Sequence, residues 1–189
     1  MPDNASMQGK VCLITGATSG IGKAAALQIS QLGATVVMVG RNPQRTAAAI
    51  QEIRQKSNND QVESMLADLS SQEEIRHLAE NFKSRYQRLD VLVNNAGALM
   101  LSRQQSVDGI ELTFALNHLN YFLLTNLLLD TLKSSGPARI VNVSSDSHHD
   151  ASLDFEDIQL ERNYGGYKAY GRSKLANLLF TYELARRFA

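Results

Sequence analysis

Residues 15–22 read Thr15-Gly-Ala-Thr-Ser-Gly-Ile-Gly22 and directly follow a short apolar run, Val11–Thr15. An apolar run that ends in glycine is typical of a buried parallel strand. A helix is expected next, from about Gly20 to Leu32, because apolar residues recur there at helical spacing and Gly33 can end it. The sequence therefore predicts a strand, a glycine-rich turn and a helix in direct succession.

The glycines of this turn have separate expected roles. Gly16 permits a tight turn off the strand, Gly20 lets the backbone approach a pyrophosphate group, and Gly22 lets the helix pack close to the sheet. The free N–H groups and partial positive charge at the helix start favour phosphate binding. The spacing G-x3-G-x-G differs from the common G-x-G-x-x-G, and a plain tight turn is the alternative. We expect nucleotide contacts at Gly16, Ser19, Gly20, Ile21 and Gly22.

Strands and helices alternate along the whole chain. Strands are predicted at Val11–Thr15, Thr35–Val39, Val62–Ala67, Leu89–Val93 and Ala138–Val143. Helices are predicted at Gly20–Leu32, at Pro43–Ile53, after a cap at Ser70 or Ser71, from about Val107 to Leu132, and from near Tyr167 onward. This alternation indicates an α/β, Rossmann-like, doubly wound parallel sheet of order 3-2-1-4-5. A ligand is expected beyond the carboxyl ends of strands one and four.

Composition limits the classes of function. A length of 189 residues with 43% hydrophobic content suits one domain, so residues 1–189 are expected to form a single dinucleotide-binding domain. The 19 basic and 19 acidic residues cancel, which removes the simplest electrostatic case for nucleic-acid binding. The single cysteine, Cys12, cannot form an internal disulfide, so a reducing, cytoplasmic location is expected.

No segment reads as a targeting signal or a membrane span. Met1–Gln8 is polar, and the most apolar run, Leu119–Leu132, contains polar interruptions and falls short of the roughly 20 residues a span needs. The last predicted helix has no capping glycine, and no further strand follows it. We therefore expect an N-terminal fragment of a longer single-domain protein, the alternative being a short chain whose edge strand a partner covers.

The end of the second strand carries the signal for cofactor type. Sites that prefer NAD place an acidic residue there, whereas this chain has Arg41, with Arg45 one helical turn further on. A guanidinium group suits a 2′-phosphate through forked, charge-assisted hydrogen bonds. The sequence predicts a preference for NADP(H), with NAD(H) also possible; a solvated surface arginine is the alternative.

Two more strand ends carry candidate cofactor residues. Asp68 and Leu69 close the third strand, where the aspartate can accept a hydrogen bond from an adenine amino group or cap a helix. Asn94-Asn-Ala-Gly97 closes the fourth, and its two amides and its glycine let the main chain run close under a nucleotide. We expect contacts from Asn95, Ala96 and Gly97, although a simple turn would also explain these residues.

Tyr170 and Lys174 are spaced four residues apart on the last predicted helix and therefore share one face. A phenol has a pKa of about 10, so at neutral pH it is protonated and cannot act as a base. A neighbouring ammonium group lowers that pKa because it favours the phenolate. The spacing predicts a proton-transfer pair. Taken alone, such a pair also arises by chance.

The hydroxyl groups of Ser144 and Ser145 end the fifth strand and are expected to face the same cleft, where one could bind a substrate oxygen. No Asp/His relay occurs at suitable motif spacing, which argues against a serine hydrolase. His148 and His149 are adjacent and are expected to point apart without further ligands, so we predict no metal site.

Asn117 lies inside the long predicted helix, where asparagine is mildly unfavourable. One interpretation is a perturbed helix whose backbone carbonyl, through a water, holds Lys174. The other is a buried core amide with satisfied hydrogen bonds. The sequence leaves both open.

Taken together, the glycine turn, Asn94–Gly97, Ser145 and Tyr170-Gly-Arg-Ser-Lys174 resemble the short-chain dehydrogenase/reductase family, in the right order from Gly9 to Ala189. Further stretches are similar to its retinol-dehydrogenase-like branch: Asp108–Glu111, Asn117–Leu119, Ala138–Ser145 and Ser173–Asn177.

The resemblance implies an NAD(P)-dependent oxidoreductase acting on alcohols or carbonyls. By this resemblance Tyr170 is the general acid/base, and Lys174 supports it and binds the nicotinamide ribose. Ser145, rather than Ser144, positions the substrate oxygen, and Asn117 supports a proton relay. The implied substrate is a small lipophilic alcohol, aldehyde or ketone.

The resemblance also implies a homodimer through the long helix and the last helix. The branch commonly reads Asn-His-Leu-Gly-His-Phe where this chain has Asn117-His-Leu-Asn-Tyr-Phe122. Family members continue with more sheet and a segment that covers the substrate, which this sequence lacks. The alternatives are therefore a non-catalytic nucleotide-binding fragment, or an interaction module without a substrate lid.

Overall fold

The computed structural model describes residues 6–188, and strands alternate with helices throughout. The strands are β1 (Val11–Thr15), β2 (Thr35–Gly40), β3 (Val62–Leu66), β4 (Val91–Asn94) and β5 (Arg139–Asn142). The helices are α1 (Gly20–Gln31), α2 (Pro43–Ser57), α3 (Gln72–Arg85), α4 (Leu112–Phe114), the π-helical η1 (Ala115–Leu119), α5 (Asn120–Ser134), the 3₁₀ turn η2 (Asp146–His148) and α6 (Gly166–Phe188).

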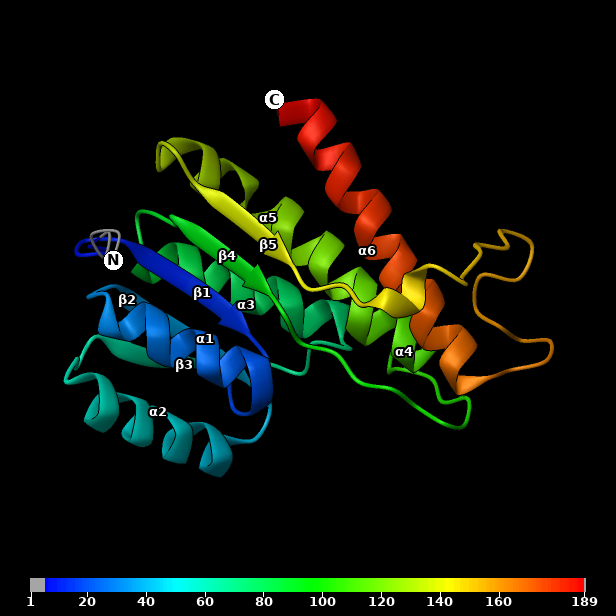
Figure 1. Cartoon of the computed structure of the whole chain (residues 1–189), viewed down its shortest axis with the longest axis horizontal. Helices are drawn as coiled ribbons and strands as arrows, with labels where there is room; N and C mark the ends of the chain where they lie inside the picture. Colours follow the sequence, from blue (N-terminus) through cyan, green and yellow to red (C-terminus); the bar gives the residue numbers. More distant parts are fainter. Residues whose placement is uncertain (1–5, 189) are drawn as a thin grey trace.

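The five strands form one parallel sheet in the order β3-β2-β1-β4-β5, which confirms the predicted topology (Figure 1). β1 is central, with Leu13 in register with Val37 of β2 and Leu92 of β4. The order reverses between β1 and β4, so the carboxyl ends of these two strands flank a crevice.

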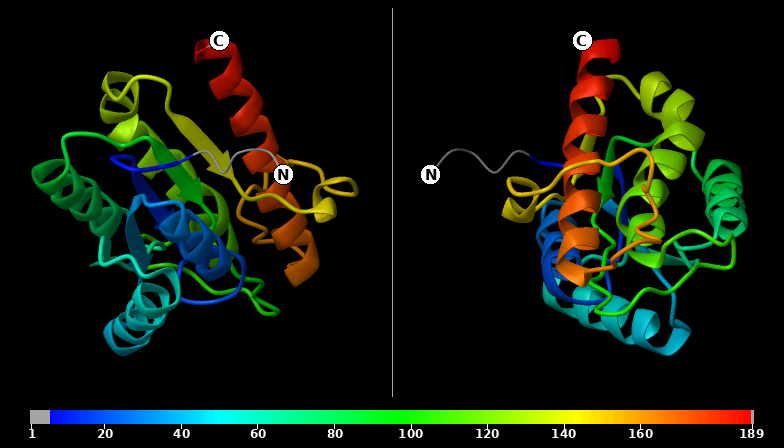
Figure 2. Two further views of the ribbon diagram at one scale, coloured as in Figure 1. Left: turned by 60° about the vertical axis from the view of Figure 1, so that its left-hand side comes forward. Right: turned by 90° about the vertical axis from the view of Figure 1, so that its right-hand side faces the viewer.

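Alternate residues of each central strand enter two separate cores, because successive side chains of a strand point to opposite faces. Leu13 and Val37 pack with α3 and α5, whereas Cys12 and Ile14 pack with α1 and α2. Figures 1 and 2 show these helix pairs on the two faces of the sheet, with α6 beside α5 and next to β5. β5 is an edge strand, and Val141 in it is 46% exposed.

Helix starts differ in a way that bears on ligand binding. The Asn42 side chain accepts a hydrogen bond from the backbone of Arg45 and caps α2, and Ser71, not Ser70, caps α3. Helix α1 has no side-chain cap at its start. Helix α2 continues to Ser57, one turn beyond its predicted end.

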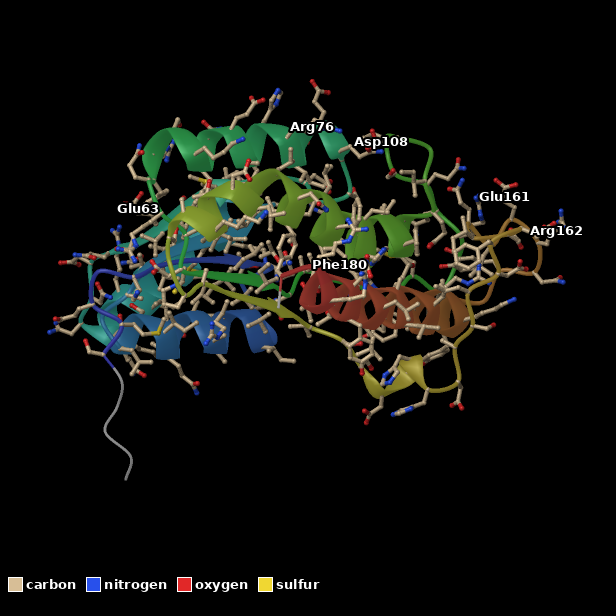
Figure 3. All side chains as sticks on the ribbon, turned by 90° about the horizontal axis from the view of Figure 1, so that it is seen from above. Glu63, Arg76, Asp108, Glu161, Arg162 and Phe180 are labelled. Carbon is tan, nitrogen blue, oxygen red and sulfur yellow. The ribbon has the colours of Figure 1, made fainter. Side chains whose placement is uncertain are left out.

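The long helix predicted to begin at about Val107 begins instead at Leu112. Gly109 has a φ of +75°, and the Glu111 carboxylate caps the helix by accepting from the backbone of Thr113 and Phe114. The Asp108 side chain, in the same loop, accepts a hydrogen bond from the backbone N–H of Gln72 at the start of α3 (Figure 3). The predicted start was wrong because it followed the apolar spacing of this segment and gave too little weight to the turn signal of Gly109 and the cap signal of Glu111.

Across residues 6–188, no helix combines the length and the apolar composition needed to cross a bilayer. The polar N-terminal run Met1–Gln8 lies largely outside the described residues.

Candidate active site

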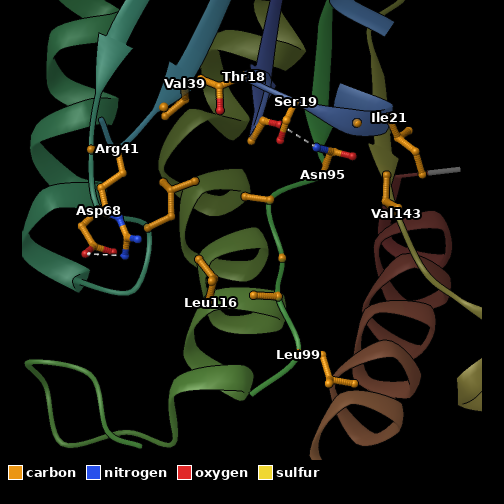
Figure 4. Close-up of a pocket in the computed structure, with 18 of the residues that line it drawn as sticks. Thr18, Ser19, Ile21, Val39, Arg41, Asp68, Asn95, Leu99, Leu116 and Val143 are labelled. Carbon is orange, nitrogen blue, oxygen red and sulfur yellow. Dashed lines mark hydrogen bonds and ion pairs between the residues drawn. The ribbon is translucent and has the colours of Figure 1, made fainter. Parts of the chain in front are cut away.

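A cleft of about 770 Å³ opens at the carboxyl ends of the strands, where the sheet order reverses (Figure 4). The predicted residues that line it are Gly16, Ser19, Gly20, Ile21, Arg41, Arg45, Asp68, Leu69, Asn95, Ala96, Gly97, Tyr170 and Lys174. Of the other candidates, Gly22, Asn117 and Ser145 are not among its lining residues. The structure therefore brings the glycine turn and the Tyr–Lys pair to one cleft.

Sequence reasoning missed several residues of this cleft. They are Thr18, Val39, Gly40, Ala67, Ala98, Leu99, Met100, Leu116 and Val143. Most are small or aliphatic and carry no chemical signature. For Val39, Gly40, Ala67 and Val143, a position at or directly beside a predicted strand end was the available signal. Leu116, which lies in η1, had no such signal.

The glycine turn is packed closely on one side and open on the other. A Cβ atom on Gly16, whose φ is +64°, would lie 2.8 Å from the Cα of Ala96, and one on Gly22 would lie 2.5 Å from the Gly16 carbonyl oxygen. Gly20, with a φ of +54°, has nothing within 4 Å of its Cβ position. The turn thus holds α1 against the sheet and leaves bare backbone toward the cleft.

Thr15 joins this turn to the end of β4. Its hydroxyl oxygen accepts from the backbone N–H groups of Asn95 (2.9 Å) and Ala96 (3.1 Å). In the other direction, the Asn95 side-chain amide donates hydrogen bonds to the carbonyls of Thr15 (2.9 Å) and Gly16 (3.2 Å). These bonds lock the two candidate nucleotide-binding turns to each other.

Arg41 and Asp68 lie at one end of the cleft (Figure 4). The Arg41 side chain is 77% exposed, and its Nη1 lies 3.6 Å from Asp68 Oδ2. The other Asp68 oxygen accepts from the backbone and hydroxyl of Ser70. Burial raises the pKa of Asp68, but the bonds from Ser70 and the charge of Arg41 outweigh it, so the pKa lies below its usual value. Asp68 therefore shapes the turn before α3 while Ser71 caps the helix.

This geometry fits a dinucleotide. The uncapped start of α1 and the bare Gly20 offer backbone N–H groups to a pyrophosphate, and the guanidinium of Arg41 offers a cation at the far end.

At the opposite end, Lys174 lies against Tyr170 on α6. The ammonium Nζ is 5.4 Å from the centroid of the Tyr170 ring and donates to the Val143 carbonyl at 3.1 Å. Lys174 is only 3% exposed, and burial lowers its pKa to about 8. A Cβ atom on Gly97 would lie 3.6 Å from Nζ, so the turn after β4 also borders the ammonium group.

The two serines after β5 have different surroundings. The Ser144 hydroxyl donates to the main-chain carbonyl of Lys174 at 3.0 Å and is thus tied to α6. Within the described part of the chain, the Ser145 hydroxyl bonds only with Ser147, whose own carbonyl lies against Gly171 of α6. Of the two serines, Ser145 is therefore the one whose hydroxyl is not bonded to α6.

Asn117 lies in the π-helical segment η1 and is fully buried. Its side chain accepts from the backbone N–H of Ala98 (2.8 Å) and donates to the Ala98 carbonyl (2.9 Å) and the Ser173 hydroxyl (3.0 Å). Its own carbonyl accepts from the Asn177 side chain (2.8 Å). The helix is perturbed, as one interpretation held, and the amide has a full set of partners, as the other held. The hydrogen bond of Lys174 goes to Val143 instead.

The expectation that His148 and His149 point apart is wrong. Their ring centroids are 4.0 Å apart, at the end of the 3₁₀ turn η2. Among residues 6–188, no group of three or more His, Cys, Asp or Glu side chains is arranged to hold a metal ion.

A doubly wound parallel sheet with a glycine turn and a Tyr–Lys pair at its switch point defines a Rossmann-type nucleotide-binding protein. More narrowly, the chain belongs to the short chain dehydrogenase family, which matches residues 10–189. Its sequence places it in the retinol-dehydrogenase-like branch. The expected family and branch are thus confirmed.

Similar proteins support this assignment. Retinol dehydrogenase 12 of Mus musculus is 46% identical over 184 residues, which cover 97% of this chain and 58% of that protein. An uncharacterised protein of Mycobacterium paratuberculosis superposes with a TM-score of 0.86 at 38% identity, covering 98% of this chain and 65% of that one. A short chain dehydrogenase of Escherichia coli CFT073 in complex with NADPH gives 0.81 at 26% identity, covering 99% and 75%. The chain spans a little over half the length of the retinol dehydrogenase.

Proposed function

We propose that this protein is an NADP(H)-dependent oxidoreductase that interconverts a small lipophilic alcohol and its carbonyl compound. The observation that carries the proposal is the buried Lys174 ammonium beside the Tyr170 ring, in the same cleft as the glycine turn. The similarity to retinol dehydrogenase 12 supports a lipophilic substrate, and the NADPH-bound relative supports the cofactor.

A bound nicotinamide supplies hydride to a carbonyl carbon or accepts hydride from an alcohol carbon. In reduction, Tyr170 gives its phenolic proton to the substrate oxygen, and the Lys174 ammonium stabilises the resulting phenolate. Ser145 donates a hydrogen bond to the oxygen as charge develops on it. In oxidation the phenolate takes the proton back. Asn117 fixes the backbone of Ala98 and the Ser173 hydroxyl around this site.

The cofactor contacts are proposed from the residues that line the cleft. Gly16, Ser19, Gly20 and Ile21 would surround the pyrophosphate, with Gly22 behind them. Arg41 and Arg45 would bind a 2′-phosphate, Asp68 and Leu69 the adenine, and Asn95, Ala96 and Gly97 the nucleotide beyond it. Lys174 and Tyr170 would contact the nicotinamide ribose.

Tyr170→Phe tests the reaction assignment. Loss of the general acid should lower kcat for NADPH-dependent carbonyl reduction by at least ~100-fold, while the Kd for NADPH, measured by calorimetry, changes less than about threefold. Tyr182→Phe, an exposed tyrosine on the same helix, is the control. Retained turnover in Tyr170→Phe would exclude this mechanism.

The second candidate is a nucleotide-binding protein without turnover, for which the open glycine turn at the uncapped start of α1 is the supporting observation. NADPH binding with no turnover on any lipophilic aldehyde would support it. The third candidate is an interaction module. Absence of nucleotide binding would support it.

We also propose a homodimer through α5 and α6, supported by half-exposed Phe122 and Leu179 on these helices. Leu179→Lys should then yield monomers in sedimentation experiments. A reducing, cytoplasmic location is proposed from the buried free thiol of Cys12.

A further inference from the structure

We infer that Tyr121 is a positioning residue for Lys174: the face of its ring holds the lysine ammonium beside the ring of Tyr170. The Lys174 Nζ lies over the Tyr121 ring, 5.8 Å from its centroid, and 5.4 Å from the Tyr170 centroid. A cation within about 6 Å of an aromatic face is attracted by the ring quadrupole. The ammonium therefore lies over aromatic faces from two different helices, α5 and α6.

The location of Tyr121 makes this contact a fixed one. It lies at the start of α5, directly after the π-helical turn, and is 0% exposed. Because the π-turn inserts an extra residue into the helical repeat, it changes which residues of α5 face α6. The side chain cannot move away into solvent, so its ring stays against the lysine.

The remaining surroundings of Lys174 supply little compensation for its charge. The groups that face it are Tyr170 from its own helix, Tyr121 from α5, the Val143 carbonyl after β5, and the backbone of Gly97 after β4. No ion pair found within residues 6–188 includes Lys174. One carbonyl and two ring faces therefore stabilise a buried cation.

This stabilisation matters because burial favours the neutral amine. The pKa of Lys174 is already lowered to about 8 by burial. Loss of one ring face would lower it further, toward the pH at which the enzyme must keep the ammonium charged. Tyr121 thereby extends the pH range over which Lys174 can support Tyr170.

The ring, rather than the hydroxyl, is the part of Tyr121 that acts. Its buried hydroxyl has no hydrogen-bond partner among the described residues. Tyr121→Phe should therefore preserve the effect, whereas an aromatic ring of nearly the same size with electron-withdrawing fluorines should abolish it.

The test measures the pKa of Lys174 by NMR of protein labelled with [ε-¹³C]lysine, with Lys174→Arg used to assign the resonance. Tyr121→Phe should leave that pKa within about 0.2 units of wild type. Replacing Tyr121 with 3,4,5-trifluorophenylalanine should lower it by about half a unit to one unit. The same replacement at Tyr86, which directly follows α3 and stacks on Phe82, should leave it unchanged.

Equal Lys174 pKa values with the phenyl and trifluorophenyl rings would overturn the proposal, and a lowered value with the fluorinated ring alone would support it. Both rings are close in size, so thermal melts should show both variants folded. The inference rests on the role proposed for Lys174, but its readout needs neither cofactor nor turnover. Failure of the Tyr170→Phe test would therefore count against the function, not against the ring contact.

Discussion

Lys174 shows how a functional group is kept at a cost to stability. The residue is 3% exposed, and among residues 6–188 its ammonium donates to one acceptor, the Val143 carbonyl. Burial holds its pKa at about 8 in the folded protein, against about 10.4 in an unfolded chain. Between pH 8 and about pH 10 the unfolded chain therefore keeps the lysine proton while the folded protein loses it. The free energy of unfolding should rise with pH over this range.

Lys174→Met should stabilise the protein at neutral pH. The substitution replaces a buried cation by an apolar side chain of similar length, and we expect the free energy of unfolding at pH 7 to rise by about 2 kcal/mol. The gain should shrink as the pH rises from 8 to 10, because the folded wild-type protein loses the lysine proton over that range while the unfolded chain keeps most of its own. Urea unfolding at pH 7, 8.5 and 10 measures it.

Lys168→Met is the matched control, because Lys168 is exposed on the same helix. It should change stability by less than about 0.5 kcal/mol at every pH. A Lys174→Met variant less stable than wild type at pH 7 would contradict the argument.

Asn117→Leu should be strongly destabilising, because it leaves several buried groups without partners. The backbone of Ala98 and the Ser173 hydroxyl would lose their bonds to the amide. We expect a loss of about 2–4 kcal/mol in the free energy of unfolding, measured in urea. Asn126→Leu, at an exposed position of α5, should cost less than about 0.5 kcal/mol. Equal effects of the two substitutions would show that the Asn117 bonds are not structural.

At the residue scale, the sequence predicted side chains whose chemistry is recognisable and missed contacts made by the main chain. Tyr170 and Lys174 were found because their spacing alone places them on one helix face. The Val143 carbonyl that holds Lys174 could not be found, since every residue has a carbonyl. Ser144 and Ser145 could not be separated by residue reasoning, because their difference lies in which hydroxyl reaches α6.

At the element scale, the N-terminal ends of β1 and β4 are joined through one carboxylate. The two oxygens of Asp90 accept from the backbone N–H of Val11 and from the side chains of Lys10 and Arg88. Burial alone would raise the pKa of Asp90, but these donors outweigh it and lower the pKa to about 2. Because the folded pKa lies below the usual 3.8, the stability it contributes is present above pH 4 and lost as the pH falls toward 2.

Asp90→Asn should remove that contribution. At pH 6 the variant should be about 2 kcal/mol less stable than wild type, and the difference should close as the pH is lowered from 4 to 2. Urea unfolding at pH 6, 4 and 3 gives the comparison. Asp130→Asn, which removes an exposed carboxylate, should leave the pH dependence unchanged. A gap that stays constant down to pH 3 would contradict a titrating Asp90.

Elements were predictable where local signals agreed and not where they competed. The strands and α1 were predicted closely, since apolar runs are bounded there by glycine and cap residues. The segment before Leu112 failed because its apolar residues conflict with Gly109 and the Glu111 cap. The π-turn at Asn117 depends on bonds to Ala98, Ser173 and Asn177, which are distant in sequence, and so only the asparagine itself could signal it.

For the whole molecule, one cleft joins groups from both halves of the sheet, so a ligand that fills it should stabilise the entire fold. A ligand that binds only the folded protein adds about 2.7 kcal/mol at a concentration 100 times its Kd. For a domain of this size that corresponds to a rise in Tm of roughly 5–10 °C. NADPH should produce this rise, and NADH at the same concentration a smaller one.

The difference between the two nucleotides should depend on Arg41. Because Arg41 is 77% exposed and its ion pair with Asp68 contributes little, Arg41→Ala should leave the Tm of the free protein within about 2 °C of wild type. It should reduce the rise caused by NADPH and leave the rise caused by NADH unchanged, since only NADPH carries a 2′-phosphate. Arg76→Ala, on α3 (Figure 3), is the control and should alter neither. Equal rises in Tm with both nucleotides in the wild-type protein would contradict the proposed preference for NADP(H). Loss of both rises in Arg41→Ala would indicate a role for Arg41 in folding the cleft.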